Sequence, residues 1–207
     1  MMGATETVET RIALVAALEA LRSARRDDEV VITTMGSARE WMKLGQPHSL
    51  DIILVPSAMG HGTSLGLGLA LARPENRVIV CSGDGSLLMN LGSLASIVAA
   101  SVPNLVVVVF DNGVYEVTGQ QPTAGAAGAR GGIRPADFCG IARACGFDSV
   151  YRFSNVAEWR EKVRRMLDSR GPTFIALDVA PVDGGTAPYS PGPAPARARQ
   201  FMDALRR

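Results

Sequence analysis

Short runs of β-branched and aliphatic residues alternate along the chain with segments in which apolar residues recur every three or four positions. Continuous apolar runs are typical of strands covered on both faces, whereas the longer spacing is typical of amphipathic helices. The predicted strands are residues 30–32, 51–55, 78–81, 105–110 and 174–179. The predicted helices are residues 8–21, a segment from 38 onward, a segment ending at 72, and residues 86–100, 135–145 and 155–167.

Strands that alternate with helices of about 10–15 residues indicate βαβ units. We therefore predict an α/β fold with a doubly wound, mainly parallel sheet of about six strands and helices on both faces. Residues 1–180 are predicted to form the domain, and residues 181–207 a Pro/Gly-rich tail with a short helix at 197–205. The Gly- and Ala-rich stretch 118–132 is predicted to be an irregular loop. In such sheets a ligand lies beyond the carboxyl ends of the strands.

Length and composition narrow the class of protein. The chain has 207 residues, which suits one sizeable domain, and its net charge of +1 favours neither nucleic acid nor an anionic membrane as a partner. It shows no secretory-signal pattern and no apolar run of membrane-spanning length. The cysteines, Cys81, Cys139 and Cys145, lack metal-ligand spacing and are expected to be small buried hydrophobes. We expect a cytoplasmic protein.

Candidate chemistry concentrates where two successive strands end. Gly83-Asp84-Gly85-Ser86 closes one predicted strand and opens a helix, and Asp111-Asn112-Gly113 closes the next strand. A single right-handed crossover separates the two stretches, and adjacent parallel strands lie about 4.8 Å apart. The spacing can therefore place the Asp84 carboxylate and the Asn112 amide oxygen side by side at one edge of the sheet.

This pair of oxygen ligands suits Mg²⁺, which takes one or two carboxylates and completes its coordination with phosphate oxygens. Gly83 and Gly85 would let backbone N–H groups approach a diphosphate, and the helix beginning near Ser86 would direct its positive end at the same anion. Gly-Asp-Gly alone is a common turn. Its combination with Asp-Asn-Gly one crossover later indicates a metal–diphosphate site.

The two stretches together resemble the cofactor motif of thiamine-diphosphate enzymes, in which the second element is usually Asn-Asn. The resemblance implies a thiamine-diphosphate-binding fold, with Asp84 and Asn112 as side-chain ligands of Mg²⁺ and Val114 as a ligand through its backbone carbonyl. Asp111 departs from the usual Asn, but it matches a position that does not bind the metal.

Further stretches resemble phosphonopyruvate and sulfopyruvate decarboxylases: residues 33–40, 57–62 and 119–123, in the same order and spacing. The resemblance implies that Gly36 and Ser37 help to hold the diphosphate. It also implies that Met59 supports the bent cofactor, and that the backbone carbonyl of Ser57 accepts a hydrogen bond from the aminopyrimidine.

Other residues near these stretches have competing interpretations. Gly60 and Gly62 have the first spacing of a dinucleotide-binding fingerprint, but Leu65 occupies the place of its third glycine. His61 either caps a helix or faces the substrate as a proton relay. Arg130 and Arg134 are either solvated charges or anchors for an anionic substrate on a mobile lid.

In the families that the chain resembles, a glutamate on a separate pyrimidine-binding domain activates the cofactor. Glu40 and Glu116 lie near the cofactor loops, on the diphosphate side. The resemblance therefore implies a partner, a pyrimidine-binding (alpha) subunit that carries the glutamate, in an α₂β₂ hetero-oligomer or a multiple of it. The implied activity is decarboxylation of a small anionic 2-oxo acid. The alternatives are a carboligase subunit similar to acetolactate synthase, and a non-catalytic regulatory subunit.

Overall fold

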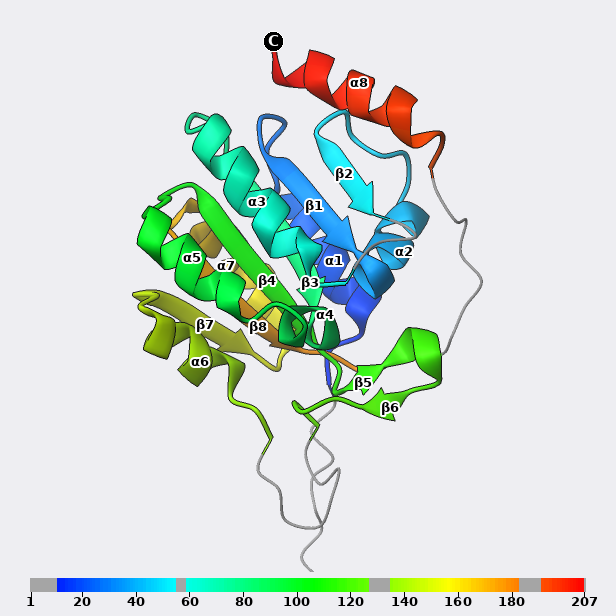
Figure 1. Cartoon of the computed structure of the whole chain (residues 1–207). Coiled ribbons are helices and arrows are strands. Elements are labelled where there is room, and N and C mark those ends of the chain that lie inside the picture. The colour runs from blue at the N-terminus through cyan, green and yellow to red at the C-terminus, as the bar shows by residue number, and fades with distance from the viewer. Residues whose placement is uncertain (1–10, 55–58, 127–134, 183–190, 207) are drawn as a thin grey trace, which may run out of the picture.

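Six parallel strands form the central sheet of the chain (Figure 1). The structure is a computed structural model, and it describes residues 11–54, 59–126, 135–182 and 191–206. The strands stand in the order β2-β1-β3-β4-β8-β7. Their bounds are Val30–Thr34 (β1), Asp51–Leu54 (β2), Val78–Gly83 (β3), Leu105–Asp111 (β4), Ser149–Phe153 (β7) and Thr173–Asp178 (β8).

Helices cover both faces of the sheet, which confirms the doubly wound architecture (Figure 1). One face carries α1 (Leu14–Ala24), α2 (Met35–Lys43) and α7 (Val156–Asp168). The other face carries α3 (His61–Ala72), α4 (Asp84–Leu88), α5 (Gly92–Ala100), α6 (Phe138–Cys145) and α8 (Ala194–Leu205). No helix in the described part of the chain is long and apolar enough to cross a membrane.

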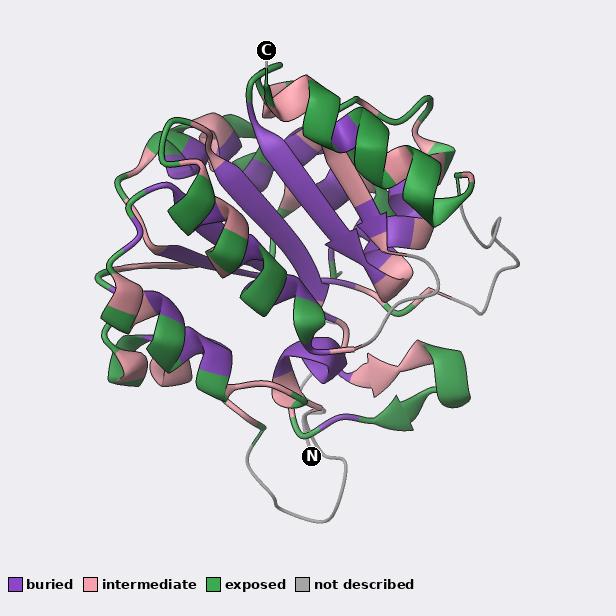
Figure 2. Cartoon of the chain, turned by 45° about the horizontal axis from the view of Figure 1, so that its top comes forward, coloured by how far each residue is buried: buried purple, intermediate pink, exposed green. Residues whose placement is uncertain are grey.

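The two helical layers pack on alternate residues of the same strands. In β4, Val106 and Val108 belong to the core beneath α1 and α7, whereas Val107 and Val109 belong to the opposite core. All seven residues of β4 are buried, and the central strands are almost entirely buried in Figure 2. Full burial of an aliphatic side chain contributes about 1.5–3 kcal/mol, so this strand fixes the centre of the sheet.

Some helices differ from their predicted bounds, such as α1 (Leu14–Ala24, predicted at 8–21) and α2, which begins at Met35 rather than at residue 38. Two elements of the main fold differ further. β7 was not predicted, because its residues Ser149 and Arg152 interrupt the apolar pattern of a half-exposed edge strand. The predicted helix 86–100 is divided into α4 and α5 at residues 89–91. At this division the side-chain nitrogen of Asn90 donates a hydrogen bond to the carbonyl oxygen of Gly60 (2.8 Å), the residue directly before α3.

A small hairpin occupies part of the segment that was predicted to be irregular. β5 (Val114–Tyr115) and β6 (Gln121–Pro122) pair antiparallel, with a 3₁₀ turn, η1 (Glu116–Thr118), between them. Residues 127–134 of the same segment lie outside the described residues. The tail contains α8, which agrees with the predicted helix at 197–205, and Phe201 of α8 is buried in the core. The domain boundary at residue 180 stays a prediction.

Two glycines of α3 make a matched test of how this helix packs on the sheet. A Cβ at Gly66 would lie 2.3 Å from Cγ2 of Val80, whereas a Cβ at Gly68 would have no atom within 4 Å. Gly66→Ala should therefore lower the free energy of unfolding by about 1–2 kcal/mol, because overpacking outweighs the gain in helix propensity. Gly68→Ala should raise it by about 0.5–1 kcal/mol. Urea unfolding of both variants measures the difference, and equal effects would contradict this packing.

Candidate functional site

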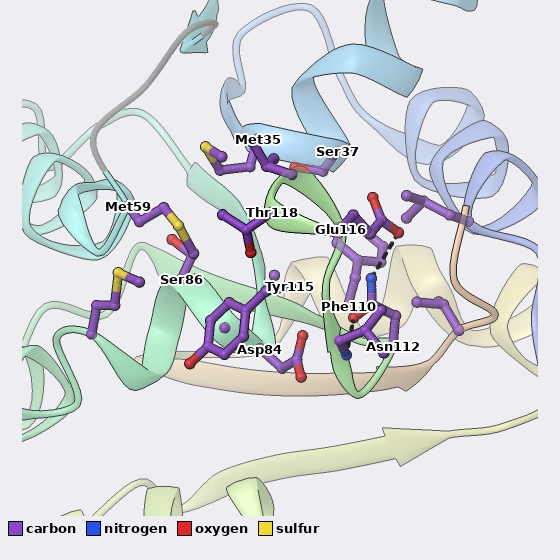
Figure 3. A pocket seen from close by; sticks show the side chains of 18 residues that line it. Met35, Ser37, Met59, Asp84, Ser86, Phe110, Asn112, Tyr115, Glu116 and Thr118 are labelled. Atoms are coloured by element: carbon purple, nitrogen blue, oxygen red, sulfur yellow. Dashed lines mark hydrogen bonds between the residues drawn. The ribbon is translucent and has the colours of Figure 1, made fainter. Parts of the chain in front are cut away.

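A cavity of about 220 Å³ lies at the carboxyl ends of β1, β3 and β4 (Figure 3). Nine of the residues that the sequence predicted to bind cofactor or metal line it, although they come from four separate segments. These residues are Gly36, Ser37, Met59, Gly83, Asp84, Gly85, Ser86, Asn112 and Val114. The cavity lies at the carboxyl edge of the sheet, where ligands bind in such folds, and binding of cofactor or metal by these residues stays a prediction.

Parallel pairing of β3 with β4 brings the two motif stretches together. Gly83, the last residue of β3, pairs with Phe110 of β4. Asp84 and Asn112 therefore follow the ends of two neighbouring strands. Thr123 links the two stretches directly, since its hydroxyl donates to Oδ2 of Asp84 (2.6 Å) and its backbone N–H donates to the carbonyl oxygen of Gly113 (2.8 Å).

Asp84 is a buried carboxylate at the first position of α4, with 1% of its surface exposed. Burial raises its pKa above the usual value, and hydrogen bonds from Thr123 and from the backbone N–H groups of Gly85 and Gly113 oppose this increase. In the part of the chain that the structure describes, no basic side chain forms an ion pair with Asp84. A bound cation would therefore stabilise the ionised form of this carboxylate.

Asn112 is held on both sides of its amide group. Its Oδ1 accepts a hydrogen bond from the backbone N–H of Val114 (2.9 Å), and its Nδ2 donates to Oε1 of Glu116 (2.8 Å). Its backbone carbonyl accepts a hydrogen bond from Arg11 (2.9 Å). This local turn places the Asn112 side chain and the backbone of Val114 along the same wall of the cavity.

Tyr115 and Thr118 of the hairpin also line the cavity, and sequence reasoning assigned them no role (Figure 3). The Tyr115 ring lies against Gly85, where an added Cβ would be 2.5 Å from Cε1 of Tyr115. Position 85 therefore requires glycine in this conformation. The only sequence signal for these contacts was the resemblance of residues 119–123, which includes Thr123 but does not reach Tyr115.

The two predicted serines in the described part of the chain, Ser37 and Ser86, have local bonding partners. The Ser37 hydroxyl donates to the carbonyl oxygen of Thr34 (2.8 Å) and accepts from the Thr34 backbone N–H (3.1 Å), so it caps α2. The Ser86 hydroxyl accepts from the backbone N–H of Gly60 (2.9 Å), which ties α4 to the start of α3. Contact of either residue with a diphosphate stays a prediction.

Four further residues were predicted to belong to the site, and the structure describes one of them, His61. His61 is exposed at the start of α3, and its Nδ1 lies 3.1 Å from the carbonyl oxygen of Met59. It is not among the residues that form the cavity wall, and its role as a proton relay stays a prediction. Ser57, Arg130 and Arg134 lie outside the described residues.

Together, the parallel sheet and the cavity at its carboxyl edge define an α/β cofactor-binding domain. A family model described as the C-terminal TPP-binding domain of thiamine pyrophosphate enzymes matches residues 33–177. The chain belongs to this family. The matched region includes the ends of β1, β3 and β4, and it contains all the residues that line the cavity except Leu14 and Val179.

Named relatives have the same kind of domain. The chain is 36% identical over 191 residues to a phosphonopyruvate decarboxylase of Streptomyces viridochromogenes, covering 91% of this chain but only 46% of the relative. It is also 36% identical over 156 residues to the sulfopyruvate decarboxylase subunit beta of Methanothermobacter thermautotrophicus, covering 75% and 76% of the two chains. The chain thus spans less than half of the first relative and most of the second.

A solved structure has the same fold. A protein from Mycobacterium smegmatis, described as a thiamin diphosphate-dependent enzyme, superposes with a TM-score of 0.66. The alignment covers 83% of this chain and 32% of the other, at 19% sequence identity. At this identity the likeness supports the architecture of the domain.

Asp111 provides a test of the electrostatics at this edge of the sheet. Burial, and then the neighbouring carboxylate of Asp84, raise the pKa of Asp111 from 3.8 to about 6. The folded chain therefore binds a proton here more tightly than the unfolded chain does. Asp111 should lower stability as the pH rises from about 4 to about 6, and the loss should persist above that range.

We expect Asp111→Asn to raise the free energy of unfolding at pH 7.5 by about 1–3 kcal/mol, and to change it little at pH 4. Arg152 keeps its ion pair with Asp178 in this variant, so no basic group loses every partner. Urea unfolding at both pH values, with a chelator present, gives the comparison. A gain of equal size at both pH values would contradict the raised pKa.

Proposed function

We propose that this chain is the diphosphate- and Mg²⁺-binding subunit of a two-subunit, thiamine-diphosphate-dependent 2-oxo acid decarboxylase. The observation that carries the proposal is the cavity in which Asp84 and Asn112 follow the ends of adjacent parallel strands. Similarity to decarboxylases, among them sulfopyruvate decarboxylase beta subunits, supports the reaction class.

The residues of the cavity suit the cofactor and its metal. Asp84 would supply one carboxylate oxygen, Asn112 an amide oxygen and Val114 a backbone carbonyl, a set of hard oxygen ligands of the kind that Mg²⁺ takes together with phosphate. A Cβ at Gly83 would meet no atom within 4 Å, so a phosphate group can approach the backbone there. Thiamine diphosphate, when bound, supplies an electron sink for the electrons left by departing CO₂.

The two glutamates of this chain near the cofactor loops are already bound to neighbouring groups. Burial favours a raised pKa for Glu40, but the hydrogen bonds and the positive charges of Lys43 and Arg39 together outweigh burial and lower this pKa. Glu116 bonds to Asn112 and Arg39. Because the carboxylates of Glu40 and Glu116 already accept these hydrogen bonds, we propose that the activating glutamate comes from a pyrimidine-binding partner subunit. We place the complex in the cytoplasm, which agrees with the buried free thiols of Cys81 and Cys139.

Two large apolar side chains at the cavity are exposed, which favours a partner subunit that covers the opening of the cavity. Met89 and Val117 both line the cavity, yet they are 58% and 69% exposed. Exposed apolar groups beside a binding site are typical of protein interfaces. We propose that the pyrimidine-binding subunit buries them in an α₂β₂ assembly.

The reaction can be tested with the chain co-purified with its partner, by measuring CO₂ release from sulfopyruvate, phosphonopyruvate and pyruvate. We expect release from at least one anionic 2-oxo acid, dependent on Mg²⁺ and thiamine diphosphate. Asp84→Asn should lower kcat/KM at least about 100-fold, because it removes the charged metal ligand. Asp178→Asn, at the end of β8 and not among the residues that line the cavity, is the matched control.

Cofactor binding without turnover of any 2-oxo acid would contradict the decarboxylase proposal. Product analysis with an added acceptor aldehyde distinguishes simple decarboxylation from carboligation. Full activity of the Asp84→Asn complex would contradict the metal site.

The partner surface can be tested with two methionines of similar exposure. Met89 is 58% exposed beside the cavity, and Met202 is 53% exposed on α8, which packs near the amino ends of the strands. Met89→Asp should weaken the complex about 10-fold or more, because it places a charge in an apolar interface, whereas Met202→Asp should leave the affinity within about twofold. Analytical ultracentrifugation or surface plasmon resonance with the purified partner measures both. Equal affinities would show that Met89 lies outside the interface.

A further inference from the structure

Glu116 joins three separate parts of the chain beside the cavity, and its hydrogen bond with Asn112 is visible in Figure 3. It lies in η1, directly after β5, and its side chain is only 7% exposed. Its Oε1 accepts hydrogen bonds from Nδ2 of Asn112 (2.8 Å) and from the backbone N–H of Val182 (2.9 Å). Its Oε2 accepts a hydrogen bond from Arg39 of α2 (3.2 Å).

These contacts determine which way the Asn112 amide faces. An ionised carboxylate only accepts hydrogen bonds and a backbone N–H only donates. Because Glu116 lies on one side of the amide and the N–H of Val114 on the other, the nitrogen must face Glu116 and the oxygen must face Val114. With Glu116 absent, the first of these two constraints is lost.

The fixed orientation leaves the amide oxygen, and not the nitrogen, available to bind a cation. An amide oxygen has two lone pairs, and the hydrogen bond from Val114 uses one of them, which leaves the second for a cation. A flipped amide would present two N–H donors instead, and these cannot bind a metal ion. Groups that orient a metal ligand in this way contribute substantially to metal affinity.

We propose that Glu116 is a positioning residue for Mg²⁺, which holds the Asn112 amide oxygen in place for the metal ion. The inference rests on the proposed function, since it assumes that Asn112 binds the metal. It also assigns Arg39 a role, because its hydrogen bond to Glu116 joins the metal-binding turn to the first turns of α2. Those turns contain Gly36 and Ser37, which line the same cavity.

Glu116→Gln tests the proposal with little change in shape. The new side-chain amide at position 116 can accept a hydrogen bond from Asn112 only if its nitrogen faces the Arg39 guanidinium. That orientation places two hydrogen-bond donors against each other. In the opposite orientation it presents a donor to Nδ2 of Asn112 and favours a flipped Asn112 amide. Either orientation weakens the constraint on Asn112.

Glu40→Gln is the matched control. Glu40 has the same side-chain exposure of 7% and also accepts a hydrogen bond from Arg39 (2.9 Å), but it does not line the cavity. A general effect of neutralising a buried glutamate beside Arg39 would appear in both variants. An effect through Asn112 would appear only in Glu116→Gln.

Calorimetry measures the binding of thiamine diphosphate to the full chain in complex with its partner. The measured quantity is the Mg²⁺ concentration that gives half-maximal binding. We expect this concentration to rise about 10- to 100-fold for Glu116→Gln and to change within about twofold for Glu40→Gln. Thermal unfolding without cofactor monitors the fold of each variant. A Glu116→Gln complex that is folded and keeps the wild-type Mg²⁺ requirement would overturn the inference.

A double-mutant cycle with Asn112→Ala separates orientation from a general structural effect. Once Asn112 is removed, Glu116→Gln should cause little further loss of Mg²⁺ affinity, whereas additive losses would overturn the inference. If instead the wild-type complex binds thiamine diphosphate without any need for Mg²⁺, or does not bind it at all, the proposed function itself fails. The two failures are therefore distinguishable.

Discussion

Parallel pairing of β3 with β4 is the constraint on which the cavity depends. The register places Gly83 beside Phe110, so the residues that follow both strands enter the same space at one edge of the sheet. The aliphatic side chains of β4, buried by helices on both faces, hold this register, because a slip by one residue would move every side chain to the opposite layer. The positions of Asp84 and Asn112 thus depend on a core that contains neither of them.

The hairpin of β5 and β6 supplies further contacts that hold the cavity residues in place. It supplies Tyr115, which lies against Gly85, and Glu116, which holds the Asn112 amide, and it leads directly into Thr123, which bonds to Asp84. Burial makes the negative charge of Asp84 costly, and the described chain places no basic side chain in contact with it. A divalent cation would neutralise this charge, which explains how a buried carboxylate can serve as a binding group.

The sequence was sufficient for the features that depend on local patterns. The valine-rich run at 105–110 identified a doubly covered strand, and one crossover between two strand-end motifs was enough to predict the adjacency of their strands. The edge strand β7 was missed because Arg152 and Ser149 weaken its pattern. The contacts of Glu116 could not be predicted, since its partners Arg39 and Val182 lie 77 and 66 residues away in the sequence. Such contacts depend on the folded arrangement of three segments.

The central claim is that Asp84 and Asn112 bind one metal ion at the edge of the sheet. The most direct measurement is a crystal structure of the complex with thiamine diphosphate and Mn²⁺ in place of Mg²⁺, with the metal located by its anomalous scattering. The account predicts a single metal peak within about 2.2 Å of an Asp84 carboxylate oxygen and of Oδ1 of Asn112. A metal peak bound by other residues, or Asp84 and Asn112 side chains that share no ion while the cofactor is bound, would contradict it.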